Sequence, residues 1–254
     1  MKNVFEILGI DKKVNYVGQK IPKKMFYQHG NLSKDDEKIF LDYIDKIEMS
    51  YVLDSNNINI DPLINEEYNY PSIGYMKVML KKDDKLEKIS KIMQSNIPSP
   101  LIIVFEYNGN VCISCSLKRV NKSDNSKVVV DDINTTPWID FDNIDENSDR
   151  FISSMSMSNL DHSNFYNFYK MIDDKIYTFK NLEVVGEYKQ DDSQSIEYIK
   201  GIIEKINAYE GELNKIIIKI KKESQFNKKM KFNIEANNIK DKMKILKQKL
   251  NNKL

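Results

Sequence analysis

Two apolar runs joined by Asn108-Gly109 give the clearest signal in the hydrophobic pattern. Residues 101–107 and 111–117 are rich in β-branched and aromatic side chains, which favour strands. Asn-Gly tolerates the two positive φ angles of a type I′ turn better than other dipeptides. The pattern therefore predicts a β-hairpin, in which Tyr107 pairs with Asn110, Phe105 with Cys112 and Ile103 with Ser114.

The two faces of this hairpin differ in character. Strand alternation places six apolar side chains on one face, which we expect to pack on the core: Ile102, Val104, Val111, Ile113, Cys115 and Leu117. The other face mixes apolar and hydroxyl side chains, so we expect it to be only half covered: Leu101, Ile103, Phe105, Ser114 and Ser116.

The segments before the hairpin alternate helical and extended patterns. We expect Ser33 to cap a helix whose apolar residues recur at helical spacing as far as Ile47, with a strand following at residues 50–53. Residues 75–80 alternate as a strand, and residues 86–93 carry a one-sided helical pattern. A strand, a helix and a strand in succession predict a crossover with two parallel strands. The antiparallel hairpin then makes the sheet mixed.

Beyond the hairpin the pattern is weaker. Residues 127–130 are a candidate edge strand, and residues 140–158 are expected to form an acidic, Ser-rich surface loop or a poorly ordered connector. Asp161 is a candidate N-cap for a further helix, and residues 176–185 are expected to be extended or irregular.

From Ile199 the apolar residues step by three and four, as in a coiled coil. The pattern lapses at residues 225–227 and resumes after Asn233, a candidate N-cap. The predicted seam consists of Ile199, Ile202, Ile206, Leu213, Ile216, Ile220, Ile239, Met243, Leu246 and Leu250. It needs a partner, either within the chain as a helical hairpin or outside it as an intermolecular coiled coil.

These elements place the protein in the α+β class. We expect a mixed β-sheet with a strand–helix–strand–hairpin core in residues 1–190. Residues 191–254 are expected to form a basic helical tail, either a hairpin or a coiled coil.

Composition is that of a globular protein, since 41% of the 254 residues are hydrophobic and 30% are charged. No apolar run approaches the roughly 18 residues that span a membrane, so we expect no membrane contact. Two cysteines and no export signal favour a cytoplasmic, reducing setting.

Charge is distributed unevenly, although the net charge is only +1. Residues 124–197 contain 16 acidic and 6 basic residues, a net of −10. Residues 215–254 contain 13 lysines and 3 acids, a net of +10. This asymmetry fits both a nucleic-acid contact and a tail that touches its own body.

The sequence contains no recognisable catalytic or metal-binding motif. Cys112 and Cys115 have CxxC spacing, but residues three apart on a strand point to opposite faces. His29 and His162 stand apart from any ligand spacing. The acids within residues 140–146 miss the calcium-loop template, and no Gly-rich loop indicates a nucleotide. We therefore predict no catalytic residue, no metal and no cofactor.

A divergent metal-dependent nuclease is the enzymatic alternative. Such a site needs acids on a hairpin and a lysine two residues after one of them, to bind metal and activate water. Glu106 and Lys118 are present, but Ser116 stands two residues before the lysine. Metal coordination would lack a ligand, so we favour a non-enzymatic role.

Basic residues near aromatic ones suggest nucleic-acid contacts, through charge and through stacking on bases. The candidate residues are Lys23, Lys24, Phe26 and Tyr27 near the N-terminus, and Lys228, Lys229 and Lys231 in the tail. The alternative is that the aromatic side chains dock on the core while the lysines are solvated.

The N-terminal, central and tail segments that carry these features occur in a characteristic order. They read IPKKMFY at residues 21–27, IPSPLIIVFEYNGNVCISCSLKR at residues 97–119, a following tryptophan, and KKESQFNKKMKFNIEANNIK at residues 221–240. Together they resemble a bacterial family of uncharacterised proteins, domain of unknown function 4391. The resemblance implies a setting and no mechanism, because members are often encoded beside DNA methyltransferases and helicase-type restriction subunits in defence clusters.

Three functional hypotheses follow. The first is a non-enzymatic accessory subunit of a restriction-modification or antiphage defence complex. It would bind a helicase or DNA methyltransferase partner, or a second copy of itself, through the heptad seam. The second is a nucleic-acid-binding module that contacts DNA through its lysines, and the third is the divergent nuclease.

Overall fold

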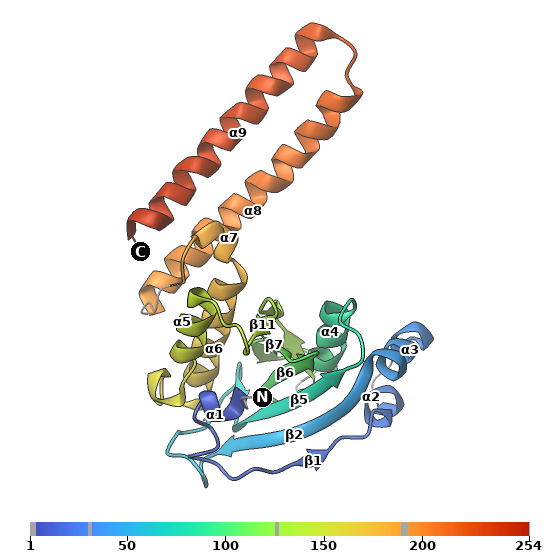
Figure 1. Cartoon of the computed structure of the whole chain (residues 1–254), viewed down its shortest axis with the longest axis vertical. Coiled ribbons are helices and arrows are strands. Elements are labelled where there is room, and N and C mark those ends of the chain that lie inside the picture. The colour runs from blue at the N-terminus through green and yellow to red at the C-terminus, as the bar shows by residue number, and fades with distance from the viewer. Residues whose placement is uncertain (1–3, 30–31, 125–126, 189–192, 254) are drawn as a thin grey trace. The chain divides into compact units, whose positions relative to one another are not determined.

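The computed structural model describes residues 4–29, 32–124, 127–188 and 193–253. They belong to two units, an α/β unit (Met1–Lys180) and a helical unit (Asn181–Leu254) (Figure 1). The helices of the α/β unit are α1 (Val4–Ile7), α2 (Lys24–His29), α3 (Lys34–Tyr43), α4 (Leu86–Asn96), α5 (Glu146–Ser154), the 3-10 helix η1 (Met157–Asn159) and α6 (Phe165–Lys180). Its strands are β1 (Gln19–Lys20), β2 (Ile44–Asp54), β3 (Leu63–Ile64), β4 (Asn69–Tyr70), β5 (Ser72–Leu80), β6 (Leu101–Tyr107), β7 (Asn110–Cys115), β8 (Lys118–Val120), β9 (Val128–Val130), β10 (Asn134–Thr135) and β11 (Ile139–Asp140).

The main sheet is mixed, as predicted. Its strand order is β1-β2-β5-β6-β7-β10, and β11 also pairs with β7. β5 and β6 are parallel and are connected through α4, whereas the other pairings are antiparallel. Two small sheets, β3–β4 and β8–β9, lie outside it, and the second contains most of the predicted strand at residues 127–130.

The β6–β7 hairpin has the predicted register. Tyr107 pairs with Asn110, Phe105 with Cys112 and Ile103 with Ser114. Asn108 and Gly109 adopt φ angles of 48° and 86°, as a type I′ turn requires.

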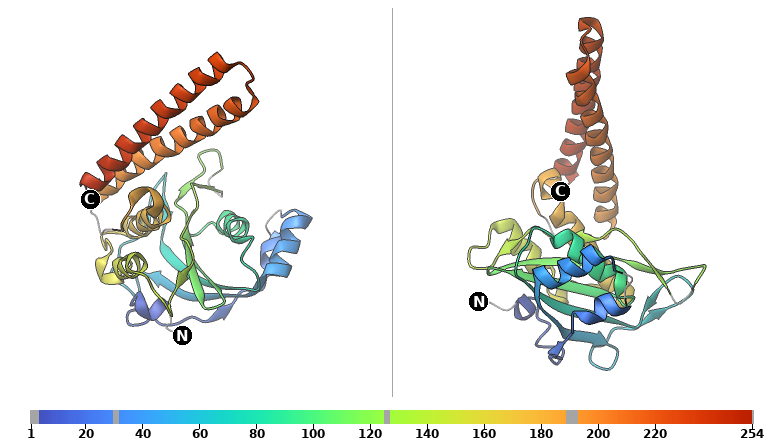
Figure 2. Two further views of the ribbon diagram at one scale, coloured as in Figure 1. Left: turned by 45° about the horizontal axis from the view of Figure 1, so that its top comes forward. Right: turned by 90° about the vertical axis from the view of Figure 1, so that its right-hand side faces the viewer.

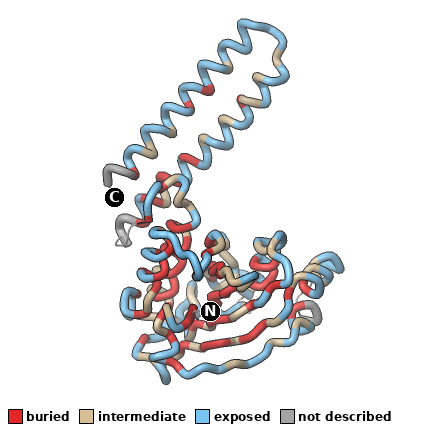
Figure 3. Tube along the Cα trace, in the orientation of Figure 1, coloured by how far each residue is buried: buried red, intermediate tan, exposed pale blue. Residues whose placement is uncertain are grey.

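Helices cover both faces of the sheet. α2, α3 and α4 pack on one face, where Phe26, Phe40 and Met93 join Ile103 and Phe105 in one apolar cluster. This face was expected to be half covered, but its five residues are at most 1% exposed. Figure 3 shows buried residues along the strands of the main sheet. The hydroxyl groups that suggested exposure bond inside, with Ser90 Oγ 2.6 Å from Ser114 Oγ.

α1 and α6 contact the opposite face. The Phe5 ring of α1 lies 5.1 Å from the Tyr51 ring of β2. The Tyr169 hydroxyl of α6 donates to the Leu101 carbonyl at 2.8 Å and accepts from the Ser116 N–H at 3.1 Å. The predicted apolar face of the hairpin is buried on this side, with Val104 and Ile113 both at 0% exposure.

Three predicted segments were assigned to the wrong type of element. Ile44 and Ile47 were placed in a helix but belong to β2, because α3 ends at Tyr43. The expected loop at residues 140–158 contains α5, whose N-cap Asp145 accepts from two backbone N–H groups. Residues 176–185, expected to be extended or irregular, are helical in α6 as far as Lys180 and again at Leu182–Val185.

The helical unit is a hairpin. α7 (Leu182–Val185) precedes α8 (Ser193–Lys222), and residues 223–225 connect α8 to α9 (Phe226–Lys253). Figure 2 shows α8 and α9 side by side in both views. Asn233, the predicted N-cap, lies inside α9, so the second helix begins earlier than the heptad pattern indicated.

Candidate functional site

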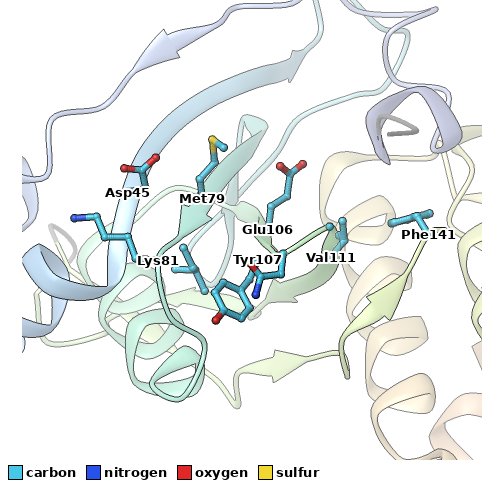
Figure 4. Close-up of a pocket in the computed structure, with 10 residues that line it drawn as sticks. Asp45, Met79, Lys81, Glu106, Tyr107, Val111 and Phe141 are labelled. Carbon is cyan, nitrogen blue, oxygen red and sulfur yellow. The ribbon is translucent and has the colours of Figure 1, made fainter. Parts of the chain in front are cut away.

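A pocket of about 250 Å³ opens at the carboxyl ends of β5 and β6 (Figure 4). Ligands of open α/β sheets commonly bind at this end of parallel strands, which makes the pocket a candidate site. Its lining residues are Asp45, Met79, Leu80, Lys81, Glu106, Tyr107, Asn108, Gly109, Val111 and Phe141.

The lysines beside the pocket are engaged with the end of α3. The backbone N–H of Lys81 donates to the Tyr43 carbonyl at 2.7 Å. The side-chain ammonium of Lys81 lies 3.4 Å from the Leu41 carbonyl oxygen. The Lys23 ammonium donates to the Ile44 carbonyl. Burial, with the nearby charge of Lys81, lowers the pKa of Lys23. Because lysines that bind the last carbonyls stabilise a helix C-terminus, both cations have a structural role.

The acids on the adjacent sheet face are paired as well. Glu106 Oε1 lies 2.6 Å from Lys77 Nζ. Glu48 accepts from the Lys46 ammonium and the Tyr16 hydroxyl. Burial acts to raise the pKa of Glu48, but the hydrogen bonds outweigh burial, and the pKa of Glu48 is lowered. In turn, the hydrogen bond to Glu48 raises the pKa of Tyr16 to about 12. Glu48 is therefore a weak base, and Lys77 neutralises Glu106.

A buried lysine lies at the opposite end of β6. Lys118 is only 3% exposed. Its Nζ donates to the carbonyls of Ile97 at 2.5 Å and of Ser99 at 2.9 Å. Burial lowers the pKa of Lys118 to about 7. Ile97 and Ser99 precede β6, whereas Glu106 lies near its carboxyl end. The structure therefore separates the two residues that the nuclease hypothesis considered together.

The two thiols point away from each other, as predicted for a strand. Cys112 Sγ donates to the Thr136 carbonyl at 3.0 Å, in the layer that α4 covers. Cys115 Sγ donates to Asp173 Oδ1 of α6 at 3.3 Å, on the other face. Burial raises the pKa of the Cys112 thiol to about 12. At neutral pH this thiol is protonated and a poor nucleophile.

The histidines give no sign of a metal centre. His162 Nε2 lies 2.7 Å from the Met157 carbonyl oxygen, and its ring lies 5.7 Å from that of Phe168. The side chain of His29 lies outside what the structure describes. Within the described ranges, no group of three or more His, Cys, Asp or Glu residues is placed to hold a metal ion.

The predicted basic and aromatic segment divides between core and surface. Phe26 is buried, with its ring 5.0 Å from that of Phe40. Lys23 binds the end of α3, and Lys24 is exposed. The Tyr27 side chain is outside the described part of the chain. Among the candidate nucleic-acid contacts of this segment, Lys24 is thus the exposed cation.

Half of the predicted seam residues lie between α8 and α9. Ile216 and Ile239 are buried there, and Leu213, Ile220 and Met243 pack against them. The remaining seam residues are buried or half-buried: Ile199, Ile202, Ile206, Leu246 and Leu250. The hairpin therefore provides the seam residues of that cluster with a partner inside the chain.

α9 carries a second set of apolar residues that the heptad pattern did not indicate. Phe226, Met230, Ile234 and Ile245 are 76%, 52%, 55% and 53% exposed. Three of them recur at intervals of four, which is a helical-face signal in its own right. The candidate lysines of the tail are exposed on the same helix: Lys228, Lys229 and Lys231.

A family model for a domain of unknown function, DUF4391, matches residues 14–243. The chain belongs to this family. The matched region includes α8 and α9 as far as Met243, so the family model covers most of the sequence of the helical hairpin. No curated protein and no solved structure matches the chain. In the described part of this DUF4391 protein, no helix has the length and apolar character to cross a membrane.

Proposed function

We propose that this protein is a non-enzymatic accessory subunit that binds a partner protein through its helical hairpin. One observation carries the proposal: α9 packs on α8 through one apolar face and exposes further large apolar residues to solvent. Exposed apolar groups of this kind on a soluble surface often mark an interaction site. The family match supports the proposal, because the matched region covers most of the hairpin.

The setting of the family suggests the partner. The resemblance to proteins encoded beside DNA methyltransferases and helicase-type restriction subunits supports a role in restriction-modification or antiphage defence. A helicase or a DNA methyltransferase is then the expected partner.

Co-purification tests the proposal. The tagged full chain is co-expressed with the products of the adjacent genes, and we expect a stable complex. Replacing Ile216 and Ile239 by Asp opens the hairpin and should abolish the complex, whereas Ile64→Asp, at a 64% exposed position of β3, should retain it. A chain that purifies alone in the presence of those products would overturn the proposal.

Nucleic-acid binding is the second candidate, supported by the exposed lysines of α9. We expect full-length protein to bind DNA with an affinity that falls steeply with salt. Replacing Lys228, Lys229 and Lys231 by Glu should weaken binding and reduce the salt slope by about one per lost phosphate contact. Lys38→Glu, an exposed change on α3, is the control. Absence of binding at low salt would remove this candidate.

Nuclease activity is tested on the same preparations. DNA is incubated with the chain, alone and in complex, with Mg²⁺ or Mn²⁺. We expect no cleavage above a metal-free control. Metal-dependent cleavage would overturn the non-enzymatic assignment.

A further inference from the structure

α9 carries two apolar faces. Phe232, Ala236 and Ile239 belong to the cluster that packs α9 against α8. Met230 and Ile234 each lie two positions before one of these residues, which is about 200° around an α-helix. They therefore point away from α8. One apolar face of α9 is used within the hairpin, and the other faces solvent.

The outer face forms a stripe, which we call the α9 stripe: Phe226, Asn227, Met230, Ile234, Asn237, Asn238, Asp241 and Ile245. At about 1.5 Å per residue, the stripe is roughly 29 Å long, the length of a partner helix of about 20 residues. Its four apolar members are all at least half exposed. A stripe of this length fits a helix laid along α9.

Lysines border the α9 stripe on both sides. Helical geometry places one group along one edge and a second group along the other. The first group is Lys228, Lys231 and Lys249, and the second is Lys229, Lys240, Lys244 and Lys247. Glu235 is the acid at one edge. An occupant with negative charge on both flanks would be complementary to this pattern.

Other occupants fit less well. In a symmetric contact with a second copy, the lysine edges would face each other and repel. A lipid surface would have to desolvate Asn237, Asn238 and Asp241 in the middle of the stripe. Nucleic acid would gain base stacking from Phe226 alone, because Met and Ile side chains offer no aromatic ring.

We infer that the α9 stripe receives an amphipathic helix of the partner protein, whose apolar seam is flanked by Asp and Glu residues. Asn237, Asn238 and Asp241 then act as polar seam positions that set the register, as buried polar residues do in coiled coils. The inference rests on the proposed function and specifies its contact surface and the chemistry of the partner.

Site-specific photo-crosslinking in the full chain tests the inference. A photoreactive amino acid replaces Ile234 in the α9 stripe, or Ile218 on α8 as the control, a residue that is 52% exposed. The chain is co-expressed with the products of the adjacent genes, and the crosslinked peptide is sequenced. We expect a crosslink from position 234, and none from 218, to a segment with apolar residues at heptad spacing between Asp and Glu.

Substitutions then measure the contribution of the stripe. Met230→Glu with Ile234→Glu should weaken the complex at least about tenfold, since buried apolar contacts at an interface centre carry much of its energy. Ile218→Glu should leave it unchanged. Circular dichroism shows whether the helices persist in each variant.

The possible outcomes separate the two proposals. If the partner co-purifies but crosslinks at 218, or tolerates the paired Glu substitutions, the stripe is not its site and only the inference fails. A crosslink to a second copy, to lipid, to nucleic acid or to a segment without acidic flanks also overturns it. If nothing co-purifies, the proposed function fails and the inference fails with it.

Discussion

Lys118 should make the stability of the α/β unit depend on pH in a way that one substitution removes. Burial lowers the pKa of Lys118 in the folded protein to about 7, against an ordinary value of 10.5. Between these values the unfolded chain holds a proton that the folded chain lacks. The free energy of unfolding therefore rises with pH from about 7, by about 1.4 kcal/mol per unit at most.

The magnitude follows from the two pKa values. Integrated from pH 7 to pH 9, the Lys118 contribution amounts to about 2 kcal/mol of added stability. The uncharged amine retains two hydrogens for the carbonyls of Ile97 and Ser99, so deprotonation keeps both hydrogen bonds. Lys118→Met removes the titrating group and with it this pH dependence.

Urea unfolding at pH 7, 8 and 9 measures the effect. Trp138, the only tryptophan of the chain, lies in the α/β unit with its ring 6.2 Å from that of Tyr107, and its fluorescence reports on this unit. The stability of wild type minus that of Lys118→Met should increase by about 2 kcal/mol from pH 7 to pH 9, because other groups titrate alike in both proteins. Lys38→Met, at an exposed site, is the control and should show no such change. A constant difference between wild type and Lys118→Met would refute the reasoning.

Three further predictions concern the thiols, a turn and a cap. Cys112 and Cys115 are buried, and the pKa of Cys112 is about 12, so Ellman's reagent should label both thiols in urea and neither quickly in native protein. Rapid native labelling would contradict the structure. Gly109→Val should lower the free energy of unfolding by about 1–3 kcal/mol, because Gly109 has a φ of 86°. Gly109→Asn should lower it less. Equal losses of stability in urea unfolding would argue against the turn. Asp145→Ala should lower the free energy of unfolding by about 1 kcal/mol at neutral pH, because it removes the N-cap of α5. Hydrogen bonds from Ser148 and Asn147 lower the pKa of Asp145, so the loss should shrink as pH falls through that pKa, and a pH-independent loss would contradict the cap.

The parts of the fold that depend on local chemistry were predictable. The Asn108-Gly109 turn fixes the register of its two strands, since only one pairing closes a two-residue loop. The segment at residues 44–54 was not predictable in the same way. β2 contains register shifts between Ile44 and Lys46 and between Met49 and Tyr51, which break the strict alternation by which a strand is read.

Polar composition concealed a helix in the expected acidic loop. Ser148 and Ser154 of α5 are buried, and Phe151 stacks on Phe179 of α6 with ring centroids 4.2 Å apart. A helix with few apolar residues still packs when a neighbouring element covers its face, and the sequence around α5 does not show that neighbour.

The candidate interaction surface was predictable only in part. The heptads of α8 and α9 indicated an apolar seam but could not say whether its partner lay inside the chain. The α9 stripe was not predicted, because the heptad pattern describes one face of α9 and the stripe lies on another face of the same helix. Phe226 and Met230 fall before Asn233, where the heptad pattern resumes.

The border of the main sheet formed by β10 and β11 is poorly suited to pairing with another strand. β10 and β11 both pair with β7, with Pro137 in the segment between them, and β1 at the opposite side is two residues long. Proline and short outer strands deny an incoming chain the long row of backbone donors and acceptors that edge-to-edge addition requires. Among the described elements, recognition by strand addition is therefore disfavoured where β10 and β11 cover β7.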